Sequence, residues 1–452
     1  MKIREIFGDS RFNRRLWHLA WPIALQSLLL ASVAAADALM LGLLEQNAMA
    51  AVALAAQISF VMSIFILGIA SGGSVLAAQY WGKKDPESLD HIFHIMLRIM
   101  ALVDLVFFLA SFFIPRQLMM IYSSDGLLIE LGGRYLRIAA WSYLLMGISQ
   151  SYQVFMKISD HARSALYVSS AAVLMNIAFN AVFIFGIGPI PQLRAEGAAI
   201  ATVISRLAEL VICLFLSCRP GYLHPRTANL LKVDSVLSRD FIRVSLPLLG
   251  ASLLWGAGFS AYTAIVGHLG ADAAAANSVA SVVRDLICCL CNGIAAAGGI
   301  LLGQELGAGN QEEARRIGIR LRDISFFIGF VSMGMVLLLT IPVVAGLKLT
   351  PLAQSYLTGM MLVQAFYMIG RTVNTVMING VFDSGGDTIF DLYSLVVVMW
   401  GISIPVALAG AFYFHWPVLA VYACTCLDEL GKIPWVCYHF QKYQWLKNLT
   451  RG

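Results

Sequence analysis

Long apolar runs follow one another along the whole chain, with only short polar segments between them. Each run is about 20 residues long, the length that an α-helix needs to cross a hydrocarbon layer of roughly 30 Å. Because the runs are continuous and do not alternate with polar residues, and because lipid offers no partner to an open backbone, they predict helices and not strands. The pattern predicts twelve spans, over residues 16–41, 48–78, 92–115, 131–156, 164–187, 195–217, 243–267, 273–303, 323–346, 355–380, 389–412 and 416–438.

The composition supports an all-α integral membrane protein. Of 452 residues, 59% are hydrophobic and 13% are charged, too few polar groups to cover a soluble protein. Little chain remains outside the spans for a soluble catalytic domain. The sequence shows no HExxH motif, no aspartates paired at metal-binding spacing and no serine–lysine dyad in a suitable context, and its eight cysteines lack zinc spacing. We therefore expect neither an enzyme nor a metalloprotein.

The basic residues predict how the spans are oriented. With the N-terminus in the cytoplasm, about 21 of the 31 Lys and Arg residues fall on inside segments and about 5 on outside segments. The opposite orientation would invert this bias. We therefore expect a multi-pass protein of the plasma membrane (in bacteria, the inner membrane) with both termini cytoplasmic. The net charge of +5 is explained by loops facing anionic lipid and requires no nucleic-acid partner.

An internal repeat relates the two halves of the chain. An offset of 225 residues (247 − 22) aligns 21–87 with 246–312 without a gap. Matches of alanine and leucine are common in such a composition, so the informative ones are Pro22/Pro247, Ser27/Ser252, Gly42/Gly267, Gly68/Gly293, Gly73/Gly298, Gln79/Gln304, Gly82/Gly307 and Glu87/Glu312.

The length of the repeat predicts the domain organisation. Six spans per repeat is an even number, so both halves cross the membrane in the same direction and are related by a pseudo-two-fold axis along the membrane normal. We expect an N-terminal six-helix lobe over 1–218, a cytoplasmic linker over 219–239 and a C-terminal six-helix lobe over 240–452. Two such lobes around a central cavity favour a secondary transporter that works by alternating access.

Asp37 is the most informative polar residue, because it interrupts the apolar stretch SLLLASVAAADALMLG. A carboxylate at the centre of a span costs about 2.5–3.5 kcal/mol on insertion scales, so it should face the bundle interior and a polar partner. Gln26 lies about three helical turns earlier on the same stripe. The repeat partner of Asp37 is Tyr262, so the shared framework does not require this acid twice. The alternative is a hydrogen-bonded structural carboxylate.

Amides and hydroxyls in the fifth and sixth spans predict partners for Asp37. Asn176 and Asn180 are spaced i and i+4 and share one helix face, and Thr202 and Ser205 follow in the next span. Buried amides need hydrogen bonds, so we expect these side chains to meet in the N-terminal lobe. Polar contact between helices, without any ion, is the alternative explanation.

These features together resemble the multidrug and toxin extrusion (MATE) transporters. The likeness rests on the PxxxQ…D…G first span, the NI…N…FIFG fifth span, the stretch EGAAIATVIS and the later GGDT, and it covers essentially the whole chain. It implies export of mainly cationic, amphipathic compounds in exchange for protons or sodium ions. It also implies that Asp37, Asn176, Asn180 and Thr202 bind the coupling ion, with no metal other than a possible Na⁺ at Asp37.

The C-terminal lobe departs from part of that family, whose members carry acids in the seventh and tenth spans. Trp255 occupies the seventh-span position, and the tenth span carries Arg371. Arg284 and Asp285 are adjacent on the eighth span, so we expect each to have another partner, and Arg371 and Asp285 could pair. We expect the substrate cavity to include Gln26, Gln150, Trp255, Tyr262, Arg284, Asp285 and Arg371; a buried structural network is the alternative.

The sequence thus predicts a monomeric antiporter, in contact with membrane lipids, that exports small organic molecules in exchange for H⁺ or Na⁺ and needs no other cofactor. The shortage of carboxylates slightly favours the proton. The alternative is a flippase of the same superfamily for a lipid-linked or anionic substrate, which Arg284 and Arg371 would suit.

Overall fold

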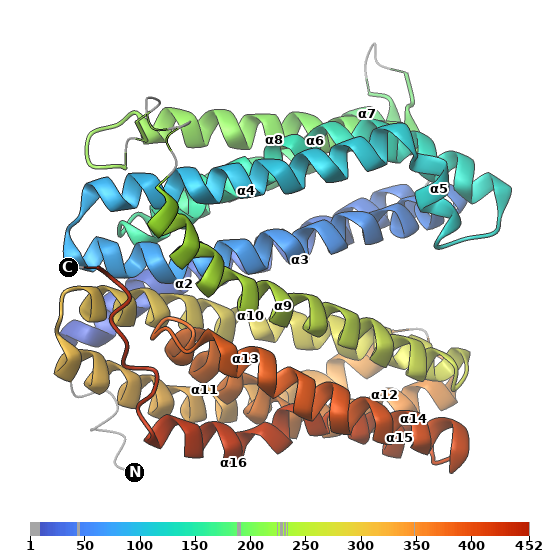
Figure 1. Cartoon of the computed structure of the whole chain (residues 1–452). Coiled ribbons are helices and arrows are strands. Elements are labelled where there is room, and N and C mark those ends of the chain that lie inside the picture. The colour runs from blue at the N-terminus through green and yellow to red at the C-terminus, as the bar shows by residue number, and fades with distance from the viewer. Residues whose placement is uncertain are drawn as a thin grey trace. The chain divides into compact units, whose positions relative to one another are not determined.

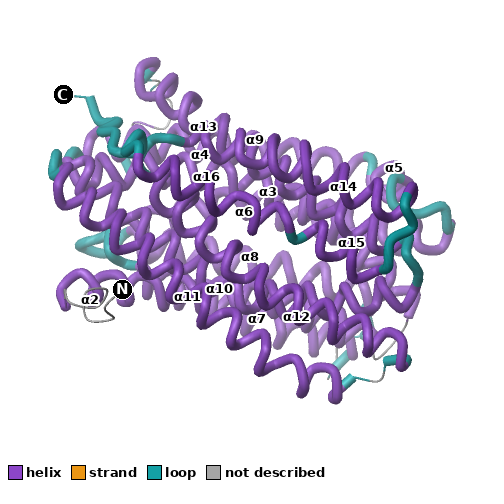
Figure 2. The backbone as a smooth tube through the Cα atoms, turned by 90° about the horizontal axis from the view of Figure 1, so that it is seen from below, coloured by secondary structure: helices purple, strands orange, loops and turns teal. Residues whose placement is uncertain are grey.

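The structure is a computed structural model. It describes residues 10–42, 46–187, 191–223, 225–226, 229, 232, 234–347 and 349–451, and for residues 10, 34–39, 42 and 46 only the backbone. In these ranges the regular structure is helical, and they contain no strand (Figure 2). The all-α prediction is confirmed.

The first half of the chain forms the helices labelled in Figure 1. They are α2 (Ser10–Gly42), α3 (Gln46–Lys83), α4 (Pro86–Phe113), α5 (Pro115–Met120), α6 (Gly126–Ile158), α7 (Ala162–Phe185) and α8 (Arg194–Ser217). The short α5 was not predicted.

The second half begins with α9 (Ser235–Gly267), α10 (Ala271–Gly307) and α11 (Gln311–Gly346). Two spans then contain π-helical stretches: α12 (Pro351–Asn374) continues into η2 (Thr375–Phe382), and α13 (Thr388–Ser394), η3 (Leu395–Ser403), α14 (Ile404–Leu408) and η4 (Ala409–Tyr413) follow directly on one another. The last span consists of α15 (Val418–Thr425) and α16 (Leu427–Gln441).

Each of the twelve predicted spans falls on one helix or on helices in direct succession, although α9 and α11 begin 8 and 12 residues before the predicted spans (243 − 235 and 323 − 311). Within the described residues, nine of these helical segments are long and apolar enough by themselves to cross a membrane. The other three correspond to α6, to α12 with η2, and to α15 with α16. The first two carry more polar side chains, and the third is divided at Cys426, so each half is short.

Local sequence explains where several helices begin and end. Asp85 caps α4 by accepting a hydrogen bond from the backbone N–H of Ser88 at 3.1 Å, and Pro86 follows where a missing N–H costs nothing. Thr350 and Pro351 start α12 in the same way. At the other end of α7, Gly186 adopts a φ of 74°, the left-handed conformation that ends many helices.

By their contacts, the residues form two compact units. The N unit comprises Leu25–Ala77 and Asp85–Ser245; the C unit comprises Met1–Ala24, Ala78–Lys84 and Leu246–Gly452. Helix α10 is the most completely buried of the candidate spans. Its alanine and cysteine face packs against methionines of α12 in the core of the C unit, so α10 provides the surface on which the other helices of that unit assemble.

Two pairs of repeat residues meet inside the C unit. A Cβ atom on Gly82 would overlap the backbone carbonyl of Gln304, and a Cβ atom on Gly307 would overlap the backbone carbonyl of Gln79. The contact is therefore reciprocal, and both glycines are required because backbone occupies the space of their missing side chains. The alignment of 21–87 with 246–312 therefore pairs residues that meet in the structure.

The C-terminal tail after α16 is hydrogen-bonded to Gln79, in the region of the contact between the repeats. Gln79 is fully buried; its Nε2 donates to the carbonyl oxygens of Ser384 and Lys447, at 3.0 and 3.2 Å, and its Oε1 accepts from the backbone N–H of Leu449 at 2.6 Å. Trp445 is also fully buried and stacks on Phe440. One glutamine side chain therefore joins α3, the loop after η2 and the tail.

Candidate functional site

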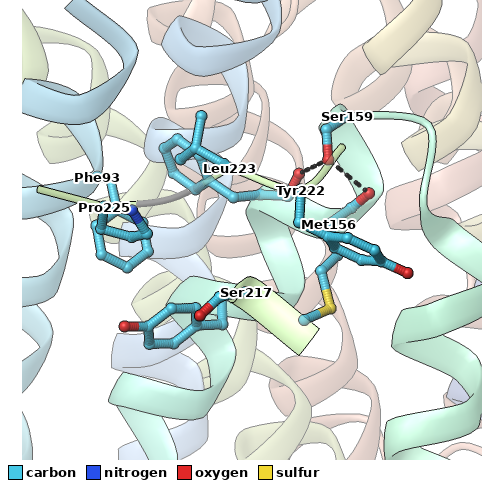
Figure 3. A pocket seen from close by; sticks show the side chains of 9 residues that line it. Phe93, Met156, Ser159, Ser217, Tyr222, Leu223 and Pro225 are labelled. Carbon is cyan, nitrogen blue, oxygen red and sulfur yellow. Dashed lines mark hydrogen bonds between the residues drawn. The ribbon is translucent and has the colours of Figure 1, made fainter. Parts of the chain in front are cut away.

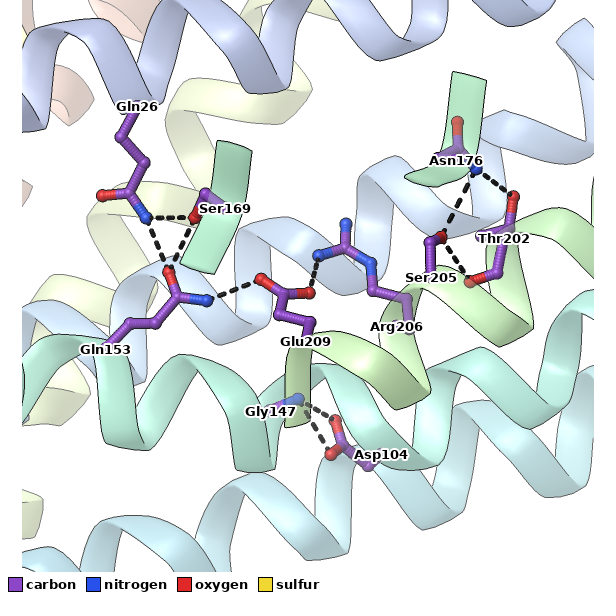
Figure 4. A network of polar contacts seen from close by, with 10 residues as sticks. All are labelled: Gln26, Asp104, Gly147, Gln153, Ser169, Asn176, Thr202, Ser205, Arg206 and Glu209. Carbon is purple, nitrogen blue, oxygen red and sulfur yellow. Dashed lines mark hydrogen bonds and ion pairs between the residues drawn. The ribbon is translucent and has the colours of Figure 1, made fainter. Parts of the chain in front are cut away.

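The predicted amide and hydroxyl cluster forms in the N unit. Asn176 and Asn180 are buried on α7, and Nδ2 of Asn180 donates to Oδ1 of Asn176 at 3.1 Å. Nδ2 of Asn176 reaches Oγ1 of Thr202 at 3.4 Å and Oγ of Ser205 at 3.5 Å on α8. Figure 4 shows Asn176 facing the two α8 hydroxyls. The structure therefore brings together four of the predicted polar residues.

The chemistry of this cluster suits a small cation. Oγ1 of Thr202 donates its own proton to the carbonyl of Ala198 at 2.9 Å, so its lone pairs point elsewhere. Amide and hydroxyl oxygens are neutral ligands for hard cations such as Na⁺. Asp37 lies on α2, but its side chain is outside the described residues.

A second polar network in the N unit joins four helices. Nε2 of Gln26 donates to Oε1 of Gln153 at 2.6 Å and to Oγ of Ser169 at 2.7 Å, and Nε2 of Gln153 donates to Oε1 of Glu209 at 2.6 Å. Nη1 of Arg206 completes the chain by donating to Oε2 of Glu209 at 2.7 Å (Figure 4).

Glu209 is 2% exposed, and it was missed in the sequence. It carried the same signal as Asp37, an ionisable residue inside an apolar span. Both of its oxygens accept hydrogen bonds and Arg206 balances its charge, so the carboxylate needs no ion to be stable. Gln150, by contrast, is on the same helix as Gln153 but has no hydrogen-bond partner within the described part of the chain.

A hollow at one end of the N unit does not fit an ion or a polar substrate. It is lined mainly by Phe93, Tyr152, Phe155, Met156 and Tyr222, with an empty volume of about 260 Å³ (Figure 3). Oγ of Ser159, one of its few polar groups, already donates to the carbonyl of Phe155. The walls are mostly apolar, and the hydroxyls of Ser159, Ser217 and Tyr222 are already hydrogen-bonded, so this hollow does not suit an ion or a polar substrate.

In the C unit, the expected pairing of Arg371 with Asp285 is wrong. Nη1 of Arg371 donates to Oε1 of Glu429 at 2.8 Å, because α16 packs directly against α12. Nδ2 of Asn374 donates to Oε2 of the same carboxylate at 2.7 Å. Trp255 lies on the other side of Arg371, with its ring centroid 5.5 Å from the guanidinium carbon. Trp255 and Arg371 are thus neighbours, as a shared cavity requires.

The expectation that Arg284 and Asp285 would have separate partners is also wrong. Nε of Arg284 donates to Oδ1 of Asp285 at 3.0 Å, and the guanidinium carbon lies 4.6 Å from the ring centroid of Phe259. The long arginine side chain bends back along α10, which overcomes the angular separation of adjacent residues. Tyr262 and Arg284 line one hollow of the C unit.

Three ionisable residues of the last span were also missed. Asp428, Glu429 and Lys432 are 1%, 3% and 3% exposed. The stretch LDELGK lies inside the predicted span 416–438, and ionisable residues inside a span mark interior positions. Within the described residues, no group of three or more His, Cys, Asp or Glu side chains could hold a metal ion.

Comparison with known proteins places these features in context. The sequence model of the MatE family matches residues 22–182 and 247–409. The chain is 24% identical over 382 residues to the probable multidrug resistance protein YoeA of Bacillus subtilis, covering 83% of this chain and 82% of the relative. It is 27% identical over 399 residues to a probable multidrug resistance protein NorM of Rhodopseudomonas palustris, covering 86% and 83%.

Solved structures share the fold. A MOP superfamily transporter from Pyrococcus furiosus superposes with a TM-score of 0.87 at 16% identity, covering 100% of this chain and 99% of the other. The Vibrio cholerae MATE transporter VcmN superposes with a TM-score of 0.88 at 14% identity, covering 97% and 98%. The two-lobe, twelve-helix architecture predicted from the repeat is confirmed by these neighbours.

Proposed function

The chain belongs to the MatE family of membrane transporters, and from this premise we propose that it is an antiporter that exports small organic compounds in exchange for H⁺ or Na⁺. Family membership makes it a multi-pass transporter and not an enzyme, and links it to ion gradients and small-molecule substrates. The observation that carries the finer proposal is the α7–α8 cluster of Asn176, Asn180, Thr202 and Ser205.

The proposed mechanism depends on the charge of Asp37. An ionised carboxylate inside a span costs about 2.5–3.5 kcal/mol, and a bound proton or sodium ion removes most of that cost. For sodium, Asp37 supplies the charge and Asn176 and Thr202 supply neutral oxygens. For the proton, the same amides and hydroxyls form hydrogen bonds to the neutral acid. Loading and unloading of this site from opposite sides changes the stability of the two access states, which couples the ion to export.

Comparison with Glu209 supports Asp37 as the coupling residue. Its contacts place it in the polar interior of the N unit beside Gln26 and Gln153, but its charge is already balanced by Arg206 at 2.7 Å. A carboxylate whose charge is balanced in every state does not sense an ion gradient. Asp37 is therefore the proposed coupling residue.

We further propose that the protein is a monomer in the bacterial inner membrane, with both termini cytoplasmic and with no cofactor besides its coupling ion. The orientation follows from the excess of Lys and Arg on one set of loops. Single cysteines at exposed loop positions, labelled from outside by a membrane-impermeant maleimide in intact cells, test it. Labelling from outside at the N-terminal end of α2 or the C-terminal end of α16 would contradict the proposed orientation.

The transport proposal is tested in proteoliposomes with the wild-type protein and Asp37→Asn. We expect an imposed pH or sodium gradient to drive export of a fluorescent organic compound by the wild type, and this drive to be lost in the variant. Asp104→Asn is the matched control, because Asp104 is also an acid within a span, is 1% exposed and accepts hydrogen bonds from the backbone N–H of Gly147. Equal gradient dependence in wild type and Asp37→Asn would refute the proposal.

A further inference from the structure

The hollow that contains Arg284 is built from helices of the C unit only. Its lining comes from α9, α10, α12 and the α15–α16 junction, and its empty volume is about 430 Å³. Four aromatic side chains form much of the wall, and hydroxyls or amides supply most of the remainder: Phe259, Tyr262, Tyr367 and Tyr422, with Thr263, Asn277, Ser281 and Thr425.

Arg284 is the one charged residue among the described residues that line this hollow. Its side chain is 16% exposed. Its Nε is used by Asp285 and one face of the guanidinium lies on Phe259. Within the described chain, its two terminal nitrogens have no hydrogen-bond acceptor. Each terminal nitrogen carries N–H donors, so these groups can donate to an acceptor that enters the hollow.

The charge in the hollow is positive. The Asp285 side chain is 62% exposed, so water screens its carboxylate more strongly than the buried guanidinium. Behind the wall, Glu429 is paired with Arg371, and Asp428 is 1% exposed. The charged group that faces the hollow is therefore the guanidinium of Arg284, and its partner Asp285 is largely exposed.

We propose that this hollow binds an aromatic or polycyclic monocarboxylate, with the carboxylate bidentate on the terminal nitrogens of Arg284. Arginine matches a carboxylate with two parallel N–H···O bonds, and the phenyl and phenol rings provide apolar contact for a flat body. This proposal rests on the proposed transport function, since it names a substrate class, but it concerns binding in the C unit and not ion coupling in the N unit. An exporter with this site accepts organic acids, in contrast to one selective for cations.

Binding to the purified full chain in lipid nanodiscs tests the proposal, by equilibrium dialysis with three isosteric probes. They are 2-naphthoate, the neutral 2-naphthalenemethanol and the cationic 2-naphthylmethylammonium. We expect naphthoate to bind at least about tenfold more tightly than either of the others, as a charge-assisted hydrogen-bonded pair requires. In Arg284→Gln this preference should disappear, and Arg284→Lys should restore part of it.

Arg315→Gln is the matched control, because Arg315 also lies on an aromatic ring, that of Tyr443 at 4.7 Å, and is outside the hollow. It should keep the full preference for naphthoate. Asp37→Asn should also keep it, so loss of coupling and loss of carboxylate recognition are separable. Equal binding of the three probes by the wild type, or preference for the ammonium, would overturn the proposal even if Arg284→Gln does not fold.

Discussion

Arg371 on α12 and Glu429 on α16 form a direct ion pair across 2.8 Å, with both side chains removed from solvent. The tenth span carries this arginine and no acid, and the negative charge beside it comes from another helix. The interior of the C unit therefore contains charged groups, but the carboxylate of Glu429 is already neutralised by Arg371. A free cation would therefore gain little binding energy beside Arg371 and Glu429.

Removing one partner of this pair should destabilise the C unit. Glu429→Gln leaves the Arg371 charge buried without a counter-ion, at a cost of about 3–5 kcal/mol. The expected result is a melting temperature lower by several degrees in detergent, measured by intrinsic fluorescence. Glu130→Gln is the control, because its partner Arg134 is exposed and such pairs contribute about 0–1 kcal/mol. Equal stability of both variants would contradict the buried-pair argument.

Glu209→Gln should separate structure from coupling in the N unit. The change removes the charge that balances Arg206 and weakens the link to Gln153, so thermal stability should fall. Gradient-driven transport by the folded fraction should remain, since Glu209 is not the proposed coupling residue. The measurement is transport normalised to monodisperse protein, beside Asp37→Asn. Loss of gradient dependence in Glu209→Gln would make the two acids a coupled pair.

Asn176→Ala should weaken binding of the coupling ion. The variant removes the amide that joins Thr202, Ser205 and Asn180, and the loss of one polar ligand corresponds to a roughly three- to tenfold higher half-saturating ion concentration. Transport rate against ion concentration measures it. Ser170→Ala on the same helix is the control, because its hydroxyl donates only to the carbonyl of Leu166. A maximal rate that falls at unchanged ion affinity would place Asn176 outside the ion site.

Gly82→Ala should be poorly tolerated, because its Cβ would overlap the carbonyl of Gln304. Overpacking of this kind costs about 1–3 kcal/mol. The comparison is Gly267→Ala, another glycine of the repeat, which has open space around its Cβ position. We expect a lower melting temperature for Gly82→Ala than for Gly267→Ala. Similar melting temperatures would mean that α3 and α10 can move apart freely.

Asp383 should make stability depend on pH. Its Oδ1 is buried without a partner, and burial, with the negative charges of Asp391 and Asp387, holds the pKa of its carboxyl well above the usual 3.8. The folded state therefore holds the proton more tightly, and stability falls as pH rises from about 4 to the folded pKa. Asp383→Asn should remove this loss. The measurement is the melting temperature of the wild type and of Asp383→Asn between pH 4 and 9. The same dependence on pH in both proteins would show that Asp383 is not its source.

The sequence predicted the spans and the α7–α8 cluster because both depend on local spacing. Continuous apolar runs determine where helices cross, and an i, i+4 pair of asparagines determines which side chains share a face. The partner of Arg371 could not be found in this way. Asp285 and Glu429 are both acids in apolar spans, and only the packing of α16 against α12 decides between them. Glu209 was overlooked although the rule that selected Asp37 applied equally to it.

The reciprocal seating of Gly82 on Gln304 and Gly307 on Gln79 has the form of an isologous interface, the kind that joins two identical subunits about a two-fold axis. Here both surfaces belong to one polypeptide, so the chain behaves at this point as a homodimer whose subunits have been fused. A side chain added at either glycine disturbs half of a matched pair, because the partner is backbone. The two repeats are therefore free to diverge in their substrate and ion sites, but at this contact they have to evolve together.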